Sequence, residues 1–110
     1  MGDTRKIYLT KKEIDLKKLP LEGSYVKYVE IPYNDILLID ELFLKENIFS
    51  DLDLVFGPGD CDYLDTEKCK SLLNKINNII IDEKIKKTID LIKNILLEAI
   101  NCETGVFFDF

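Results

Sequence analysis

Histidine and tryptophan are absent from the 110 residues, and Arg5 is the only arginine. Without histidine, the usual ligand sets for zinc and haem cannot be assembled. A single arginine also leaves almost no scope for clamps that hold a phosphate by two parallel hydrogen bonds. The sequence therefore predicts neither a metal site nor an organic cofactor.

Long apolar runs are lacking as well. The longest, Ile36–Ile39 and Ile79–Ile81, fall far short of the roughly 18–20 residues that a membrane span needs. A secretory signal contains an apolar stretch of about 7–15 residues, and the first residues of this chain contain none. Three cysteines, Cys61, Cys69 and Cys102, predict free thiols that fill apolar space, because a disulfide framework uses an even number. We expect a cytoplasmic protein.

Acidic residues dominate the charge, with a net charge of −6 and a pI of about 4.6. Nucleic acids and anionic membranes are poor partners for such a surface, because they bind clusters of lysine and arginine. A basic protein would instead be attracted, and its association would be faster at low salt.

The length and balance of the chain fit one folded domain spanning residues 1–110. Hydrophobic residues make up 46% and charged residues 33%, which is typical of a globular protein with one core. Neither repeats nor low-complexity linkers divide it. The order of the patterns predicts an α+β fold, with a small, mainly antiparallel sheet and two or three helices packed on one face.

The first half of the chain gives mostly short elements. Residues 34–43 can form a helix capped by Asn34 or Asp35, although a buried strand over 36–39 fits the same apolar run. The other predictions are a strand over 6–9, a helix over 10–18 with a Thr10–Glu13 capping box, a strand over 24–31, a strand over 52–56 and a turn over 57–60.

The second half carries stronger helical signals. Asp65 can cap a helix, and Leu64 before it stands at staple spacing from Cys69. A second helix is expected from about Asp82 to Asn101, and a terminal strand follows Gly105. The apolar faces of the two helices are Cys69, Leu72, Leu73 and Ile76, and Ile85, Ile89, Ile92, Leu96, Ala99 and Ile100, the latter widened by Leu91 and Ile95.

The stretch 56–67 is the best candidate for chemistry, because a Gly-Pro-Gly turn adjoins several carboxylates and the Cys61 thiol. A calcium loop would need an oxygen ligand at Leu64, glycine at Asp65 and glutamate at Leu72, so that match fails. A nucleophilic Cys61 would need a histidine or cation, whereas its neighbouring aspartates raise a thiol pKa. Paired carboxylates for glycoside cleavage rest only on their abundance.

Two interpretations of this stretch remain open. In one, it is a surface turn whose acids cap the next helix. In the other, it is an acidic recognition surface in which Tyr63 serves as an aromatic anchor, since tyrosine is enriched at binding hot spots. Asp40, Glu41 and Glu46 are near in sequence and are expected to lie on a solvated face. The predicted partner-binding residues are Asp51, Asp53, Asp60, Asp62, Tyr63 and Glu67.

In size, acidity and its final helix leading into the aromatic strand over 102–110, the chain resembles the small immunity proteins encoded beside bacterial polymorphic and contact-dependent toxins. The resemblance implies tight binding to a cognate toxin, often a basic nuclease, with no catalysis of its own. It assigns no residues, because no family motif is present. Alternatives are a regulatory or adaptor domain that binds another bacterial or phage protein, and a small enzyme or enzyme subunit. The oligomeric state is left open.

Overall fold

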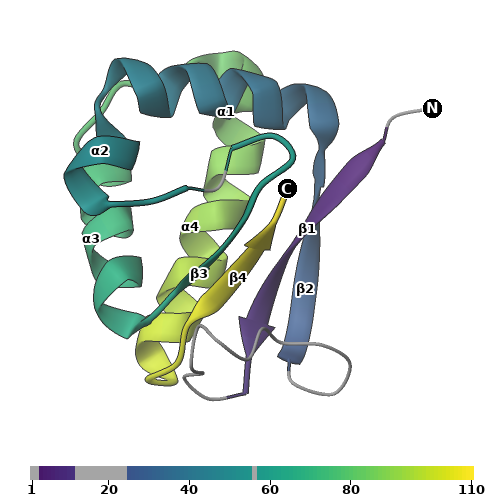
Figure 1. Cartoon of the computed structure of the whole chain (residues 1–110), viewed down its shortest axis with the longest axis vertical. Helices are drawn as coiled ribbons and strands as arrows, with labels where there is room; N and C mark the ends of the chain where they lie inside the picture. Colours follow the sequence, from purple (N-terminus) through teal and green to yellow (C-terminus); the bar gives the residue numbers. More distant parts are fainter. Residues whose placement is uncertain (1–2, 12–24, 56) are drawn as a thin grey trace.

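The computed structural model describes residues 3–11, 25–55 and 57–110. Its sheet has four strands, β1 (Thr4–Thr10), β2 (Tyr25–Pro32), β3 (Cys61–Leu64) and β4 (Val106–Asp109). They lie in the order β2-β1-β4-β3, and every neighbouring pair is antiparallel. The last strand in sequence thus lies inside the sheet, between the first and the third (Figure 1).

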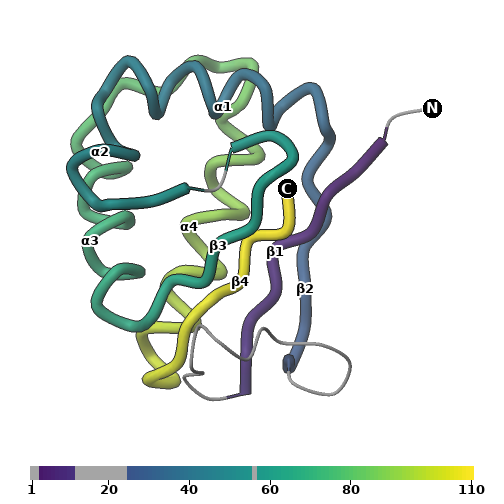
Figure 2. The backbone as a smooth tube through the Cα atoms, viewed as in Figure 1, coloured from purple at the N-terminus to yellow at the C-terminus, as the bar shows by residue number. Residues whose placement is uncertain are grey.

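Four α-helices accompany the sheet in the described part of the chain: α1 (Tyr33–Lys45), α2 (Ile48–Leu52), α3 (Thr66–Asn77) and α4 (Lys86–Asn101), the last preceded by a 3₁₀ turn, η1 (Glu83–Ile85). The tube in Figure 2 shows α4 passing behind the strands and α1 crossing the upper end of the molecule. The predicted α+β class, with a small antiparallel sheet, is confirmed.

The two faces of the sheet carry different residues. Toward the helices, β1 contributes Ile7 and Leu9 and β4 contributes Val106 and Phe108, all buried in the core. The other face carries an aromatic row across all four strands, because cross-strand partners share a face. The register of the strands makes this row Tyr28, Tyr8, Phe107 and Tyr63.

The helix α3 begins as its local sequence predicts, whereas the predicted helix over 82–101 is divided into η1 and α4, which begins at Lys86. The Asp65 carboxylate accepts a hydrogen bond from the backbone N–H of Lys68 at 2.9 Å, as a helix cap does. Asp82 caps η1 in the same way. The predicted inner faces are buried, except that Leu73 and Ile100 are half-buried and Leu91 is exposed.

The segment that was ambiguous between helix and strand is the helix α1, which buries Ile36, Ile39 and Phe43. It begins at Tyr33, directly after Pro32, so the predicted caps lie inside its first turn. That prediction was wrong because α1 follows β2 without a loop: Pro32, extended at the end of β2, is the N-cap residue, and no side chain in the described part of the chain caps the helix. The Asp35 carboxylate instead accepts a hydrogen bond from the hydroxyl of Thr88 in α4.

The predicted strand over 52–56 was also wrong for residues 52–55, and Phe56 lies outside the described residues. Leu52 ends α2, and Asp53 follows in the left-handed region with a φ of 54°. The N–H of Leu54 then bonds back to the carbonyl of Phe49, a common way to end a helix. Leu52, the last residue of α2, and Leu54, just beyond the helix, therefore both face inward. Their spacing of two residues is the same as the spacing on one face of a strand.

Two further predictions concern turns and the N-terminal region. The turn over 57–60 is confirmed: the Asp60 N–H bonds to the Gly57 carbonyl at 2.9 Å, and Gly59 has a φ of 85°. The predicted helix over 10–18 lies, beyond Lys11, outside the described residues. Thr10, expected to cap this helix, is instead the last residue of β1. Its buried hydroxyl is hydrogen-bonded to the hydroxyl of Thr104 and to the carbonyl of Gly105.

Candidate functional site

The predicted partner-binding acids do not form one surface. Asp51 in α2 accepts a hydrogen bond from Lys75 at 2.9 Å, and Glu67 in α3 lies 3.5 Å from Lys70. Both carboxylates are exposed and paired with a cation of the same chain. Such pairs contribute little to stability, but they reduce the negative field that either acid offers to a partner.

Two other predicted residues have local structural roles. The carboxylate of Asp62 accepts a hydrogen bond from the Val55 N–H at 3.0 Å, which joins β3 to the segment before the glycine turn. Asp53 ends α2, and its carbonyl accepts a hydrogen bond from Lys68 at 3.1 Å. Asp62 thus supports the fold, and Asp65 caps the next helix, as the surface-turn interpretation predicts.

Tyr63 does not project from a turn. It lies in β3, paired with Phe107, and is only 3% exposed. Its ring lies against Gly105, where an added Cβ would be 2.4 Å from the tyrosine oxygen. The prediction of Tyr63 as an accessible aromatic anchor was therefore wrong, because a strand partner distant in sequence packs this side chain.

The sixth predicted residue, Asp60, lies close to an acid of α1. A Cβ added at Gly57 would be 3.2 Å from the carboxylate of Asp40 and 3.7 Å from that of Asp60. Glycine keeps the space between the two carboxylates open. The two acids and Gly57 belong to a hollow of about 210 Å³, which we call the acidic hollow and which is lined by Asp40, Leu44, Phe49, Leu54, Val55, Gly57 and Asp60.

The negative charges of the acidic hollow are not paired with a cation among the described residues. Burial raises the pKa of Asp40, and the charges of Glu41 and Asp60 raise it further. The ion pairs found among the described residues involve other carboxylates, those of Asp3, Asp51, Glu67 and Glu98. Within the part of the chain that the structure describes, two like charges therefore share the hollow without a cation.

Apolar side chains surround this pair of acids. On α1, Leu37 and Leu44 flank Asp40 and Glu41 at helical spacing, so all four share one stripe. Leu37 is 42% exposed, Leu44 59% and Val55 60%. Exposed apolar residues next to polar ones are a feature of surfaces that another molecule covers.

Only some residues of this hollow could be identified from the sequence. Asp60 was among the predicted residues, whereas Asp40 and Glu41 were assigned to a solvated face. The leucines at positions 37 and 44 fall outside the buried stripe of α1, and that excess of apolar residues is the signal. The approach of Asp40 to Asp60 depends on the tertiary fold and has no signature in the sequence.

Cys61, at the start of β3, has a hydrogen-bonded thiol with a raised pKa. Its thiol donates a hydrogen bond to the Asp109 carboxylate, with 3.3 Å between the atoms. Burial, this hydrogen bond and the charges of Asp109 and Asp60 raise the pKa of Cys61, as the sequence predicts for a thiol among aspartates. Cys69 is buried as predicted, but Cys61 and Cys102 are exposed, so they are not the apolar fillers expected.

The described residues hold neither a candidate metal site nor a candidate membrane span. No group of three or more histidine, cysteine, aspartate or glutamate side chains there could hold a metal ion. Across residues 3–11, 25–55 and 57–110, no helix has both the length and the apolar character needed to cross a bilayer.

Comparisons of the chain with protein-family models, with curated proteins and with solved structures find no match. The candidate site therefore rests on the geometry of this chain alone.

Proposed function

We propose that this protein is a protein-binding inhibitor of the immunity type, which neutralises a basic bacterial toxin by covering part of its surface. The observation that carries the proposal is the acidic hollow, where Asp40 and Asp60 lie on either side of Gly57 beside exposed apolar residues. The surface is suited to a lysine or arginine side chain contributed by the partner.

The walls and the acids would act on different parts of such a side chain. A lysine or arginine has an aliphatic stem that packs on apolar surface and a charged head that seeks carboxylates. Leu44 and Val55 offer the apolar wall, and Asp40 and Asp60 offer the carboxylates. A cation between them would remove the repulsion that the unbound protein carries, so the relief of repulsion adds to the attraction.

The charge of the whole chain supports the same partner class. A net charge of −6 attracts a basic protein over a distance and favours a fast encounter, especially at low salt. The hollow then fixes the position of the bound cation. Long-range attraction and local docking thus favour the same kind of partner.

The proposal is tested by capture from a lysate of the organism that encodes the chain. The baits are the unmodified protein, an Asp40→Asn/Asp60→Asn variant and a control, Asp90→Asn/Glu103→Gln. The control removes two negative charges from exposed sites away from the hollow. We expect one basic protein to bind the unmodified protein and the control at least tenfold more strongly than the hollow variant.

Co-expression tests the inhibitory role separately. The product of the gene adjacent to the one that encodes this chain is expressed with each of the three forms, and growth is measured. We expect the neighbour to be toxic alone and to be neutralised by the unmodified protein and the control, but not by the hollow variant. Equal capture and equal protection by all three forms would overturn the proposal.

A further inference from the structure

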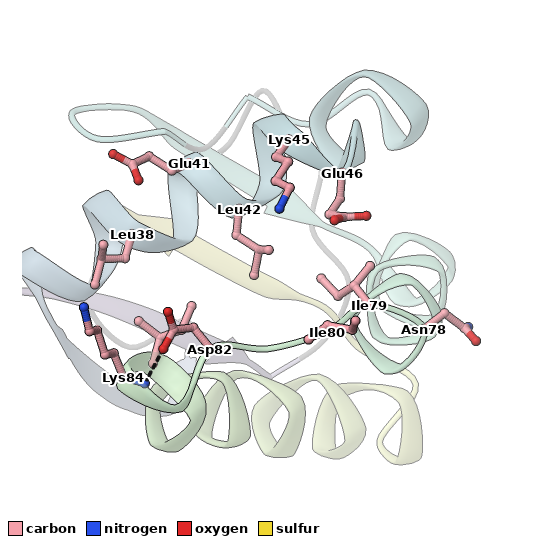
Figure 3. A pocket seen from close by; sticks show the side chains of 11 residues that line it. Leu38, Glu41, Leu42, Lys45, Glu46, Asn78, Ile79, Ile80, Asp82 and Lys84 are labelled. Carbon is pink, nitrogen blue, oxygen red and sulfur yellow. Dashed lines mark hydrogen bonds between the residues drawn. The ribbon is translucent and has the colours of Figure 1, made fainter.

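A larger groove lies on another side of α1, between this helix and the segment that joins α3 to α4 (Figure 3). Its volume is about 670 Å³, and Leu42 and Ile79 point toward its centre from opposite walls. The apolar lining is Leu38, Leu42, Ile79, Ile80 and Ile85, and the polar lining is Glu41, Lys45, Glu46, Asn78, Asp82 and Lys84.

Ile80 is the most exposed large apolar residue of the described chain, at 92%. It is displayed on a short connection that is held at both ends. Before it, Asn78 ends α3 through backbone bonds to Lys75 and Ile76; after it, Asp82 caps η1. The connection thus presents an isoleucine to solvent in a defined place, directly beside an apolar groove.

The rim of the groove differs in charge from the rest of the molecule. Glu41, Glu46 and Asp82 are offset by Lys45 and Lys84, so the rim carries a net −1, against −6 for the whole chain. Neither lysine takes part in the ion pairs found among the described residues. Both signs therefore remain available on this face, which repels a second copy far less than the molecule as a whole.

We propose that this face pairs with a second copy of the chain about a twofold axis. In such an interface one patch meets itself, so it must hold both a projection and a matching recess, and both signs of charge. The groove face has all of these: Ile80 of each copy enters the groove of the other, and Lys45 and Lys84 approach acids across the axis.

The pairing goes beyond the proposed function and leaves the acidic hollow open. The groove residues Leu38, Leu42 and Lys45 lie about 120° around α1 from the stripe of Leu37 and Leu44, at 100° per residue. The two faces are therefore neighbours on one helix, with Glu41 at the border between them. The lining of the acidic hollow itself shares no residue with the lining of the groove. A dimer would present two acidic hollows, one on each copy.

Sedimentation velocity between about 1 µM and about 1 mM tests the pairing. The samples are the unmodified protein, Ile80→Asp, and the control Val26→Asp, which places the same charge on an apolar residue of β2 that is 63% exposed. Circular dichroism and melting verify that each is folded. We expect the unmodified protein and the control to dimerise, and Ile80→Asp to weaken the dimer at least tenfold.

Several results would overturn the proposal. One is an unmodified protein that stays monomeric at about 1 mM, which would leave the groove to a different occupant or to none. Another is a dimer that persists unchanged in Ile80→Asp, which would place the interface on another face. A control that dissociates as readily as Ile80→Asp would point to β2 instead. None of these results depends on the toxin partner.

Discussion

Replacing Gly105 by alanine tests the packing that removes Tyr63 from the protein surface. The new methyl carbon would lie 2.1 Å from the Leu64 carbonyl oxygen and 2.4 Å from the Tyr63 hydroxyl oxygen. Ordinary contacts between carbon and a carbonyl oxygen are about 3.3–3.6 Å. Relief would require both the ring and the pairing of Leu64 with Val106 to shift.

The expected loss follows from these contacts. Overpacking a core position usually costs about 1–3 kcal/mol, and the carbonyl of a paired strand yields less than a side chain, so we take the upper end. The lower backbone entropy of unfolded alanine returns about 0.4–1 kcal/mol. The net loss is then about 2–2.6 kcal/mol, or a fall in Tm of about 10 °C for a domain of this size.

Urea unfolding and thermal melting measure this loss. A double variant, Gly105→Ala/Tyr63→Leu, serves as the control, since it removes the ring but leaves the Leu64 carbonyl in place. We expect it to remain destabilised. If Gly105→Ala melts within about 2 °C of the unmodified protein, the Tyr63 ring does not pack against Gly105. The hypothesis that Tyr63 is an accessible anchor would then stand again.

Three further predictions concern single elements. Leu96 is fully buried in α4, so Leu96→Ala should lower the free energy of unfolding by about 2–5 kcal/mol, whereas the exposed Lys87→Ala should change it by less than about 0.5 kcal/mol. Equal melting of these two variants would contradict the orientation of the helix. Loss of the cap in Asp65→Ala should cost about 0.5–2 kcal/mol in urea unfolding, and no measurable loss would deny its role. Asp109→Asn should lower the pKa of Cys61 and so speed its alkylation by iodoacetamide at fixed pH, as followed by mass spectrometry; an unchanged rate would show that Asp109 does not control the thiol.

The elements that could be predicted from the sequence are those with nearby determinants. In α3, the cap at Asp65 and the staple between Leu64 and Cys69 lie within a few residues of one another. In α4, the apolar stripe repeats over four turns, so its period is distinct. Such local signals do not depend on the position of the rest of the chain.

The elements that could not be predicted depend on distant partners. The strand β3 has only four residues, and its pairing with β4 makes it a strand rather than part of a loop. Tyr63 is buried because Gly105, more than forty residues away, leaves room for its ring. Asp40 and Asp60 are twenty positions apart, and only the packing of α1 beside the glycine turn brings them together.

The acidic hollow also predicts a pH dependence. Because the pKa of Asp40 is raised in the folded state, its ionisation weakens the fold at any pH above that folded pKa. The penalty shrinks as the pH falls through the folded pKa and is gone below 3.8, the ordinary value, where the carboxyl is protonated in both states. Asp40→Asn should therefore be more stable than the unmodified protein at pH 7 and lose this advantage at a pH below 3.8.

The most direct test of the account compares stability and binding in this one variant. Urea unfolding at pH 7 and calorimetric binding to the captured basic partner are measured for the unmodified protein, Asp40→Asn and the control Asp90→Asn. We expect Asp40→Asn to be at least as stable as the unmodified protein yet to bind at least tenfold more weakly, while the control matches the unmodified protein in both stability and affinity. Equal affinity of Asp40→Asn and the unmodified protein would contradict the claim that the acidic hollow receives the partner's cation.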